Sequence, residues 1–230
     1  MLILSETEWS ALKLSLLLAG GAALVTLPPG VLLGWLLARR QFPYKLLVEI
    51  LVFLPLVTPP VVTGYIILIF CGRHGWLGKP LLDGFGLQMV FAWPGMLLAA
   101  AASGFPLLVR SVRTAIEGVD VRLEQAAATL GFPPWRVFWR ITLPLAWPGV
   151  LAGSVLCFAR AVGEFGATRV VGMNTDGHRT LPLEIYYQID APDGTGVELL
   201  RLVLLSLLLS AGALCLCEFL LRRKNRGSTP

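Results

Sequence analysis

Charged residues are scarce in this sequence. Of its 230 residues, 19 are basic and 14 are acidic, which is 14% of the chain, whereas 56% are hydrophobic. A water-soluble domain has about a quarter of its residues charged, and disordered chains and coiled coils are also rich in charge. Four cysteines in a chain of this length also exclude a disulfide-rich scaffold. The composition therefore predicts a membrane protein that crosses the bilayer several times.

Familiar catalytic and cofactor motifs are missing too. The sequence has no GxxxxGK[ST] phosphate loop, no HExxH, no GxSxG and no cluster of Cys and His. Ser154, His74 and His178 lack a base and an orienting group at a recognisable spacing, and Cys215 and Cys217 lack metal-site spacing. We therefore expect no enzyme activity, no metal and no cofactor in this chain. Any energy source that the chain uses would then be an ion gradient or a partner ATPase.

Long windows with few charges predict where the chain crosses the membrane. A helix needs about 20 apolar residues to span a hydrocarbon core of roughly 30 Å, and these runs are too continuous for the alternating strands of a barrel. We expect an all-α polytopic membrane protein, with a single transmembrane domain over residues 1–230 in contact with membrane lipid. Residues 5–10 could add a short interfacial helix capped by Ser5. The five expected spans cover about residues 10–38, 48–71, 88–110, 148–170 and 199–221.

Basic residues are unevenly distributed between the connections. Residues 39–49, 110–147 and 218–226 together hold 12 of the 19 basic residues but only 5 of the 14 acidic ones. Because Lys and Arg accumulate in short cytoplasmic loops, this predicts the N-terminus outside, the C-terminus inside and the connection 111–147 in the cytoplasm. The same bias explains the net charge of +5, so we expect no nucleic acid partner.

Proline interrupts several of the windows. Each proline removes or disturbs a backbone hydrogen bond, which neighbouring helices or water must replace inside a membrane. Such residues indicate either a transport path or ordinary kinks, and both interpretations stay open. The prolines concerned are Pro28, Pro29, Pro55, Pro59, Pro60, Pro94 and Pro106.

The connection 111–147 is expected to form a helix, a turn and a second helix. Asp120 can cap a helix through Leu130, in which three consecutive alanines favour helix and leave a smooth face. Gly131 suits the left-handed turn that ends such a helix, and the Pro133-Pro134 pair favours the start of the next. A helical hairpin in a loop of a transporter-like protein is typical of a docking element.

This connection resembles the EAA loop of ABC importer permeases, EAA-x3-G-x9-I-x-LP. The departure is Gln125 in place of Glu, with Glu124 one position earlier, which leaves the local ionic contact open. The residues assigned to the motif are Glu124, Gln125, Ala126, Ala127, Gly131, Ile141, Leu143 and Pro144.

The resemblance implies the type I, EAA-loop permease fold in a bacterial inner (plasma) membrane. These residues would then form an ATPase-coupling loop that lies in a groove of a cytoplasmic ATP-binding subunit. Two copies of the chain would form the pore with two such subunits, which would use ATP and Mg²⁺. The alternative is that the alanines only build a soluble helix and Gly131 only turns it.

Arg160 and Glu164 are ionisable residues in an otherwise apolar window. Their spacing places them one helical turn apart, and charges at that depth usually pair, face the bundle interior or line a wet cavity. They form a candidate intramembrane polar site on the route of an anion. The alternative is a structural ion pair that fixes helix packing.

Residues 158–168 and 179–186 resemble the ARxxGEFGA…TLPLxIY pattern of molybdate-type ABC permeases. With the EAA loop, the resemblance covers about residues 10–222. It implies import of molybdate, with tungstate as a companion substrate, delivered by a periplasmic molybdate-binding protein. The alternatives are a sulfate or thiosulfate ABC permease and, less closely, an ATP-independent secondary anion transporter.

The connections 71–88 and 171–198 are expected outside, where they would receive the binding protein. Their aromatic residues could anchor that partner or belong to the interfacial aromatic belt. Their basic residues could meet acidic patches, draw an anion inward or simply be solvated. The residues concerned are Trp76, Tyr186, Tyr187, Arg73, Lys79 and Arg179.

Overall fold

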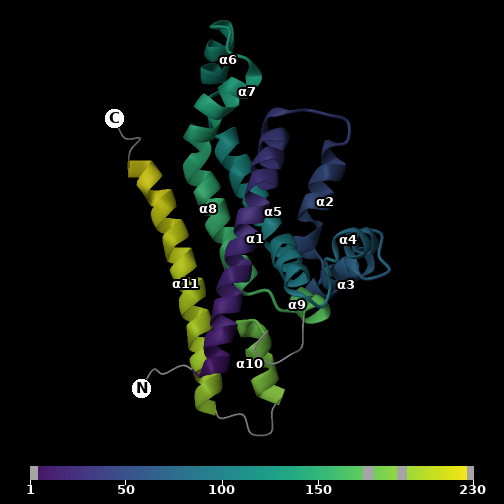
Figure 1. Cartoon of the computed structure of the whole chain (residues 1–230). Coiled ribbons are helices and arrows are strands. Elements are labelled where there is room, and N and C mark those ends of the chain that lie inside the picture. The colour runs from purple at the N-terminus through teal and green to yellow at the C-terminus, as the bar shows by residue number, and fades with distance from the viewer. Residues whose placement is uncertain (1–4, 173–178, 191–195, 227–230) are drawn as a thin grey trace.

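Four long helices run along the length of the molecule (Figure 1). The computed structural model describes residues 5–172, 179–190 and 196–226, and these ranges contain helices and no strands. The four long helices, each part of an element long and apolar enough to cross a membrane, are α1 (Glu6–Arg39), α5 (Trp93–Glu117), α8 (Leu143–Val162) and α11 (Gly196–Arg226).

Small side chains allow α1, α5 and α8 to approach one another closely. Ala19 and Ala22 of α1 meet Ala100 and Ala101 of α5 in one buried cluster. Lipid is as apolar as these side chains, so helices in a membrane associate mainly through close packing of small residues. Larger side chains of α5 then fill the space between α5 and α8 further along the bundle, where Leu108, Val112 and Ile116 are buried together with Ala146 and Val150 of α8.

The first helix begins earlier than the expected span. Ser5 caps α1 through a capping box, in which its hydroxyl accepts from the Glu8 backbone N–H and the Glu8 carboxylate accepts from the Ser5 backbone N–H. Residues 6–10 are therefore the first turns of α1 and not a separate interfacial helix. Pro28 and Pro29 lie inside α1 without ending it.

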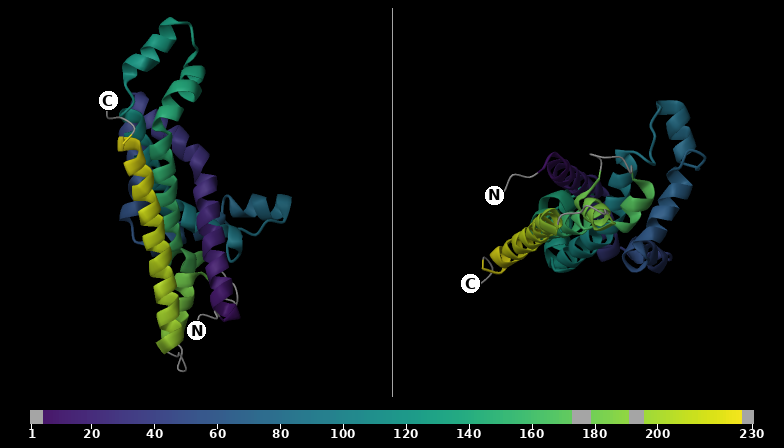
Figure 2. Two further views of the ribbon diagram at one scale, coloured as in Figure 1. Left: turned by 90° about the vertical axis from the view of Figure 1, so that its left-hand side faces the viewer. Right: turned by 90° about the horizontal axis from the view of Figure 1, so that it is seen from below.

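The second expected span, 48–71, is bent sharply where the proline pair interrupts it. It consists of α2 (Lys45–Val57) and α3 (Pro60–Cys71), which meet at an angle of 116°. Proline disfavours a helical conformation in the residue before it, and Thr58 and Pro59 are both extended, with ψ of 146° and 134°. Together with α4 (Gly78–Phe85), this pair projects from one side of the bundle (Figure 2).

The fourth expected span, 148–170, is also interrupted. Helix α8 ends at Val162, and α9 (Gly166–Val171) starts after a break of three residues. The backbone N–H of Glu164 bonds to the Ala161 carbonyl at 3.2 Å, which closes the last turn of α8. Beyond α9, α10 (Leu181–Asp190) contacts both α1 and α11.

The two ends of the bundle differ in the connections that they carry. Figure 1 places α6 (Val121–Thr129), the end of α1 and the end of α11 at one end, and α10 with the start of α1 and of α11 at the other. The three connections rich in basic residues thus share one end of the molecule. Much of the expected external connection 171–198 falls in residues 173–178 and 191–195, outside the described residues.

Close packing at Gly104 yields a test of this architecture. A Cβ added there would lie 2.7 Å from the Cys157 carbonyl oxygen and 2.5 Å from its sulfur, whereas a Cβ at Gly20 of α1 would meet nothing within 4 Å. We expect Gly104→Ala to lower the thermal unfolding temperature in detergent by forcing α5 and α8 apart. Gly20→Ala, with the better helix propensity of Ala, should leave it unchanged or raise it. Equal effects of the two variants would contradict this packing.

Candidate functional site

The connection between α5 and α8 folds as a helical hairpin at one end of the bundle. The Asp120 carboxylate accepts a hydrogen bond from the Arg122 backbone N–H at 2.9 Å and so caps α6. Gly131 follows with a φ of +83°, a left-handed conformation that costs glycine little. The chain then forms α7 (Pro134–Val137) and a π-helical turn (Phe138–Thr142) that runs directly into α8. The cap, the turn and the second helix predicted from the sequence are confirmed.

Glu124 fastens this hairpin to the bundle. Its Oε1 accepts from Arg39 Nη2 at 3.0 Å and from Arg39 Nε at 3.2 Å, and it also accepts from the Thr142 hydroxyl at 2.8 Å. Arg39 Nη2 further donates to the Val119 carbonyl at 2.8 Å. The pair is largely shielded from solvent, because the side chains of Arg39 and Glu124 are only 14% and 18% exposed. One carboxylate therefore joins α6 to α1 and to the π-helical turn.

The residues that follow Glu124 at the start of the EAA motif lie on different faces of α6. Gln125 and Ala126 are exposed, while Ala127 is buried. The local ionic contact thus belongs to Glu124 and not to Gln125. The outer surface of the hairpin combines charged side chains, among them Arg122, Arg136 and Arg140, with large apolar ones. The exposed large apolar side chains are Val121, Leu123, Leu130, Trp135 and Trp139.

The second half of the motif lies in helix and not in a loop. Ile141 is in the π-helical turn, and Leu143 and Pro144 open α8, so the second helix of the hairpin continues directly into the long helix. π-helical turns inside α-helices often occur at functional sites. Here the turn contains the buried Thr142 that bonds to Glu124, so a displacement of the hairpin would reach α8 through continuous helix.

The Arg160–Glu164 pair forms where α8 breaks. Arg160 Nη1 lies 3.0 Å from Glu164 Oε2, and the two side chains are 31% and 1% exposed. The expected pairing one turn apart is present, and Glu164 lies just beyond the end of α8. Its Oε1 accepts from the Ala167 backbone N–H at 2.9 Å. The same carboxylate thus neutralises Arg160 and satisfies a free N–H at the start of α9.

Helix α9 packs closely against α3. A Cβ on Gly64 would meet the Ala167 backbone at 2.9 Å, and a Cβ on Gly166 would meet Pro60 at 2.7 Å. The two broken spans are thus in direct contact through positions that admit no larger side chain.

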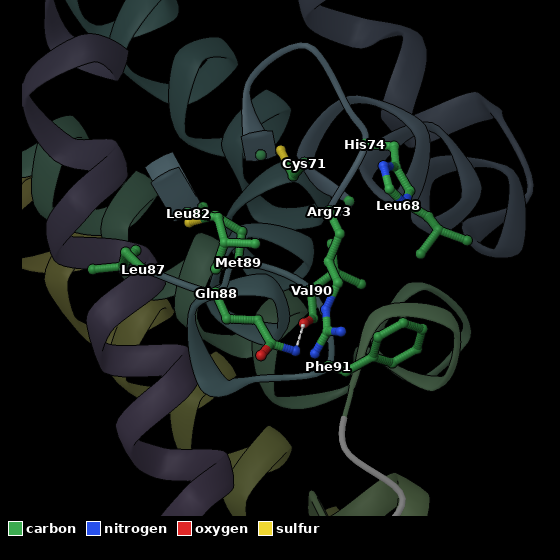
Figure 3. A pocket seen from close by; sticks show the side chains of 12 residues that line it. Leu68, Cys71, Arg73, His74, Leu82, Leu87, Gln88, Met89, Val90 and Phe91 are labelled. Carbon is green, nitrogen blue, oxygen red and sulfur yellow. Dashed lines mark hydrogen bonds between the residues drawn. The ribbon is translucent and has the colours of Figure 1, made fainter. Parts of the chain in front are cut away.

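A cavity of about 430 Å³ lies between α3, α4 and residues 87–91 (Figure 3). Its wall is mostly apolar, with Arg73, His74 and Gln88 as polar members. The Phe91 N–H bonds to the Val171 carbonyl at 2.8 Å, with Phe91 at a φ of 57°. This connection is therefore tied to the end of α9. Within the described ranges, no group of three or more His, Cys, Asp or Glu side chains is placed to hold a metal ion.

Replacing Glu124 should loosen the hairpin. We expect Glu124→Ala to lower the free energy of unfolding by about 1–3 kcal/mol, because it leaves Arg39 without its carboxylate and Thr142 without its acceptor. Gln125→Ala is the matched control and should change it by less than about 0.5 kcal/mol. Thermal unfolding and protease cleavage within residues 118–133 measure both. An equally strong effect of Gln125→Ala would contradict the anchoring role of Glu124.

Replacing Glu164 should destabilise the break between α8 and α9. Glu164→Ala should cost about 2–3 kcal/mol, somewhat less than a fully buried pair, because Arg160 is 31% exposed. The control is Glu117→Ala, which removes an i,i+4 pair with Arg113 at the surface, where Glu117 is 47% exposed, and should cost under about 0.5 kcal/mol. Thermal unfolding in detergent compares the two, and a cost at Glu164 no larger than at Glu117 would rule out the capping role.

Relatives of known family match nearly the whole chain. It is 48% identical over 222 residues to the molybdenum transport system permease protein ModB of Escherichia coli, covering 96% of both chains. It is 47% identical over 220 residues to ModB of Haemophilus influenzae, covering 95% of this chain and 96% of that one. It is also 40% identical over 213 residues to the sulfate transport system permease protein CysW of Synechococcus elongatus, covering 86% of this chain and 73% of that one.

Solved structures share the fold. A bacterial ABC transporter involved in import of the acidic polysaccharide alginate superposes with a TM-score of 0.71 at 18% identity, covering 98% of this chain and 81% of that one. The MetNI methionine ABC transporter gives a TM-score of 0.69 at 17% identity, covering 94% of each chain. The expected ABC importer permease fold is thereby confirmed. A model of the family described as binding-protein-dependent transport system inner membrane component matches residues 30–225. The chain belongs to this family and is a multi-pass protein of the inner membrane.

Proposed function

We propose that this chain is the membrane-spanning permease subunit of an ATP-driven ABC importer for molybdate, with tungstate as a companion substrate. The observation that carries the proposal is the 48% identity to a molybdenum transport permease over 96% of both chains. The chain would form the translocation path as a homodimer. A periplasmic molybdate-binding protein would deliver the anion, and two cytoplasmic ATP-binding subunits would bind and hydrolyse ATP with Mg²⁺.

The hairpin end of the bundle is proposed to face the cytoplasm. The connections that meet there hold 12 of the 19 basic residues, and short cytoplasmic loops accumulate such residues. The N-terminus would then lie outside and the C-terminus inside. The opposite end, with α10 and the start of α11, would receive the binding protein.

The outer surface of the hairpin is proposed to dock into a groove of the ATP-binding subunit. Leu130 is 78% exposed and Leu123 is 49% exposed, and apolar side chains of this size at a rigid tip are suited to burial in a partner groove. The small side chain of Ala126 would allow close approach. ATP-driven closure of the two ATPase subunits would move both hairpins and switch the spans between inward-facing and outward-facing packings.

The anchoring contacts explain how such a movement would reach the path. Glu124 ties α6 to Arg39 at the end of α1, and the π-helical turn joins the hairpin to α8 without a loop. At the far end of α8, Arg160 and Glu164 lie at the break before α9. We infer that this pair borders the anion route and that shifts of α8 change its surroundings.

Sulfate is the second candidate substrate. The 40% identity to a sulfate permease over 86% of this chain supports it, but less strongly than the molybdenum relatives support molybdate. Discrimination between these oxyanions is expected to lie largely in the binding protein.

Coupling can be tested with the permease and its ATPase reconstituted in liposomes. The molybdate-loaded binding protein should stimulate ATP hydrolysis by the parent complex. Gly131→Val should abolish the stimulation. Val at a φ of +83° is strained by about 1–2 kcal/mol, and relief of this strain would change the orientation of α6 relative to α7.

The matched control is Gly118→Val, in the same connection at a φ of −76°. It should keep the stimulation, since an added Cβ meets only ordinary contacts there. Binding-protein stimulation that survives Gly131→Val but not Gly118→Val would refute the docking role of the hairpin. Stimulation by sulfate-loaded but not molybdate-loaded binding protein would identify sulfate as the substrate.

A further inference from the structure

Helix α9 exposes one side chain and buries or half-buries the others. Ala167, Thr168 and Val171 are buried, and Gly166 and Val170 are half-buried, whereas Arg169 is exposed. The helix is also held firmly, through its contact with α3 and its cap from Glu164. Arg169 therefore extends from a rigid support.

Two aromatic rings hold the Arg169 side chain. Its guanidinium carbon lies 4.2 Å from the ring centroid of Tyr186 and 5.9 Å from that of Phe165. The two rings are themselves in contact, with centroids 5.2 Å apart. A ring face attracts a guanidinium group through its quadrupole but supplies no negative charge. The stack thus positions the group and leaves its charge in place.

Arg169 lacks the carboxylate partner that the other arginines of α8 to α11 have, among those whose side chains are described. Arg160, Arg179 and Arg201 each lie within 4.0 Å of a carboxylate, at 3.0 Å from Glu164, 3.5 Å from Glu184 and 3.4 Å from Glu8. Arg179 also stacks on Tyr187, at 3.9 Å from its ring centroid. One guanidinium group can therefore contact a carboxylate and an aromatic ring at the same time. Arg169 makes no ion pair with any described residue.

The position of Arg169 determines what it can face. It follows the Arg160–Glu164 pair by five residues, and two residues later Val171 is bonded to Phe91 beside the cavity of Figure 3. An arginine without a counter-ion is costly against lipid, so it must face water or another protein. In the proposed orientation, α9 lies toward the outer side, between the intramembrane pair and the external connections.

We propose that Arg169 is an oxyanion-binding residue at the outer entrance of the translocation path, held in place by Tyr186 and Phe165. A guanidinium group presents paired N–H donors that match two oxygens of a tetrahedral oxyanion. The aromatic stack fixes the group in advance, so little rotamer entropy is lost when the anion arrives. This inference rests on the proposed function, because it assigns one step of oxyanion import to a named side chain.

The test is molybdate uptake by the complete complex in liposomes at saturating loaded binding protein. Arg169→Gln should reduce the maximal uptake rate about tenfold, as expected for the loss of one charge-assisted contact. Arg169→Lys, which keeps the charge but loses the planar group, should fall between Gln and the parent. The concentration of binding protein that gives half-maximal uptake should change less than twofold, and stimulated ATP hydrolysis should persist.

The matched control is Lys13→Gln, which removes the same charge near the start of α1, at the end of the bundle that carries α10. Lys13 is exposed, stacks on Trp9 at 4.9 Å from the ring centroid and, like Arg169, pairs with no carboxylate of the described residues. Its removal should change uptake less than twofold, so an equal loss in both variants would overturn the site and indicate only a general electrostatic field.

Two further results would overturn the proposal. One is parent-like uptake by Arg169→Gln. The other is an unchanged maximal rate with a raised half-maximal concentration of binding protein, which would make Arg169 a protein-docking residue. If Arg169→Gln does not fold, Tyr186→Leu decides, with Tyr186→Phe as its ring-preserving control: Leu should slow uptake about threefold through loss of the stack, and Phe should not. A parent complex that takes up no molybdate would instead refute the proposed function.

Discussion

A helix that breaks inside a bilayer leaves backbone N–H and carbonyl groups that lipid cannot satisfy, and this constraint governs the arrangement of the whole chain. The break between α8 and α9 is closed by Glu164, whose carboxylate binds the Ala167 N–H and Arg160. The bend between α2 and α3 occurs at prolines, which have no N–H to satisfy. Because α3 packs on α9, the two breaks support each other, and the long helices of the bundle remain unbroken around them.

At the hairpin end of the bundle, the continuity of the helices has a mechanical consequence. The hairpin reaches α8 through a π-helical turn and reaches α1 through the Arg39–Glu124 pair. A force applied to the hairpin is therefore transmitted to two long helices of the bundle, while the breaks lie at the far end of α8. This arrangement would allow a partner that moves the hairpin at one end of the bundle to change the packing of the helices at the other end.

Local chemistry could be predicted from the sequence, and long-range geometry could not. The Asp120 cap, the Gly131 turn and the Arg160–Glu164 pair depend on neighbouring residues, and all three are present. The partner of Glu124 is 85 residues away in sequence, so no local pattern reveals it. Hydropathy marks apolar windows but does not detect a break at Thr58 or Gly163, since a broken pair of helices is as apolar as a straight one.

Under the proposed function, this chain imports molybdate only as part of an ATP-driven complex. This requirement is tested most directly by measuring the molybdenum retained inside liposomes, by elemental mass spectrometry, for the chain alone and for the chain with its ATPase. We expect accumulation only when the ATPase, ATP and loaded binding protein are all present. Accumulation by the chain alone, at the same rate with and without ATP, would contradict this requirement and would indicate a secondary anion transporter.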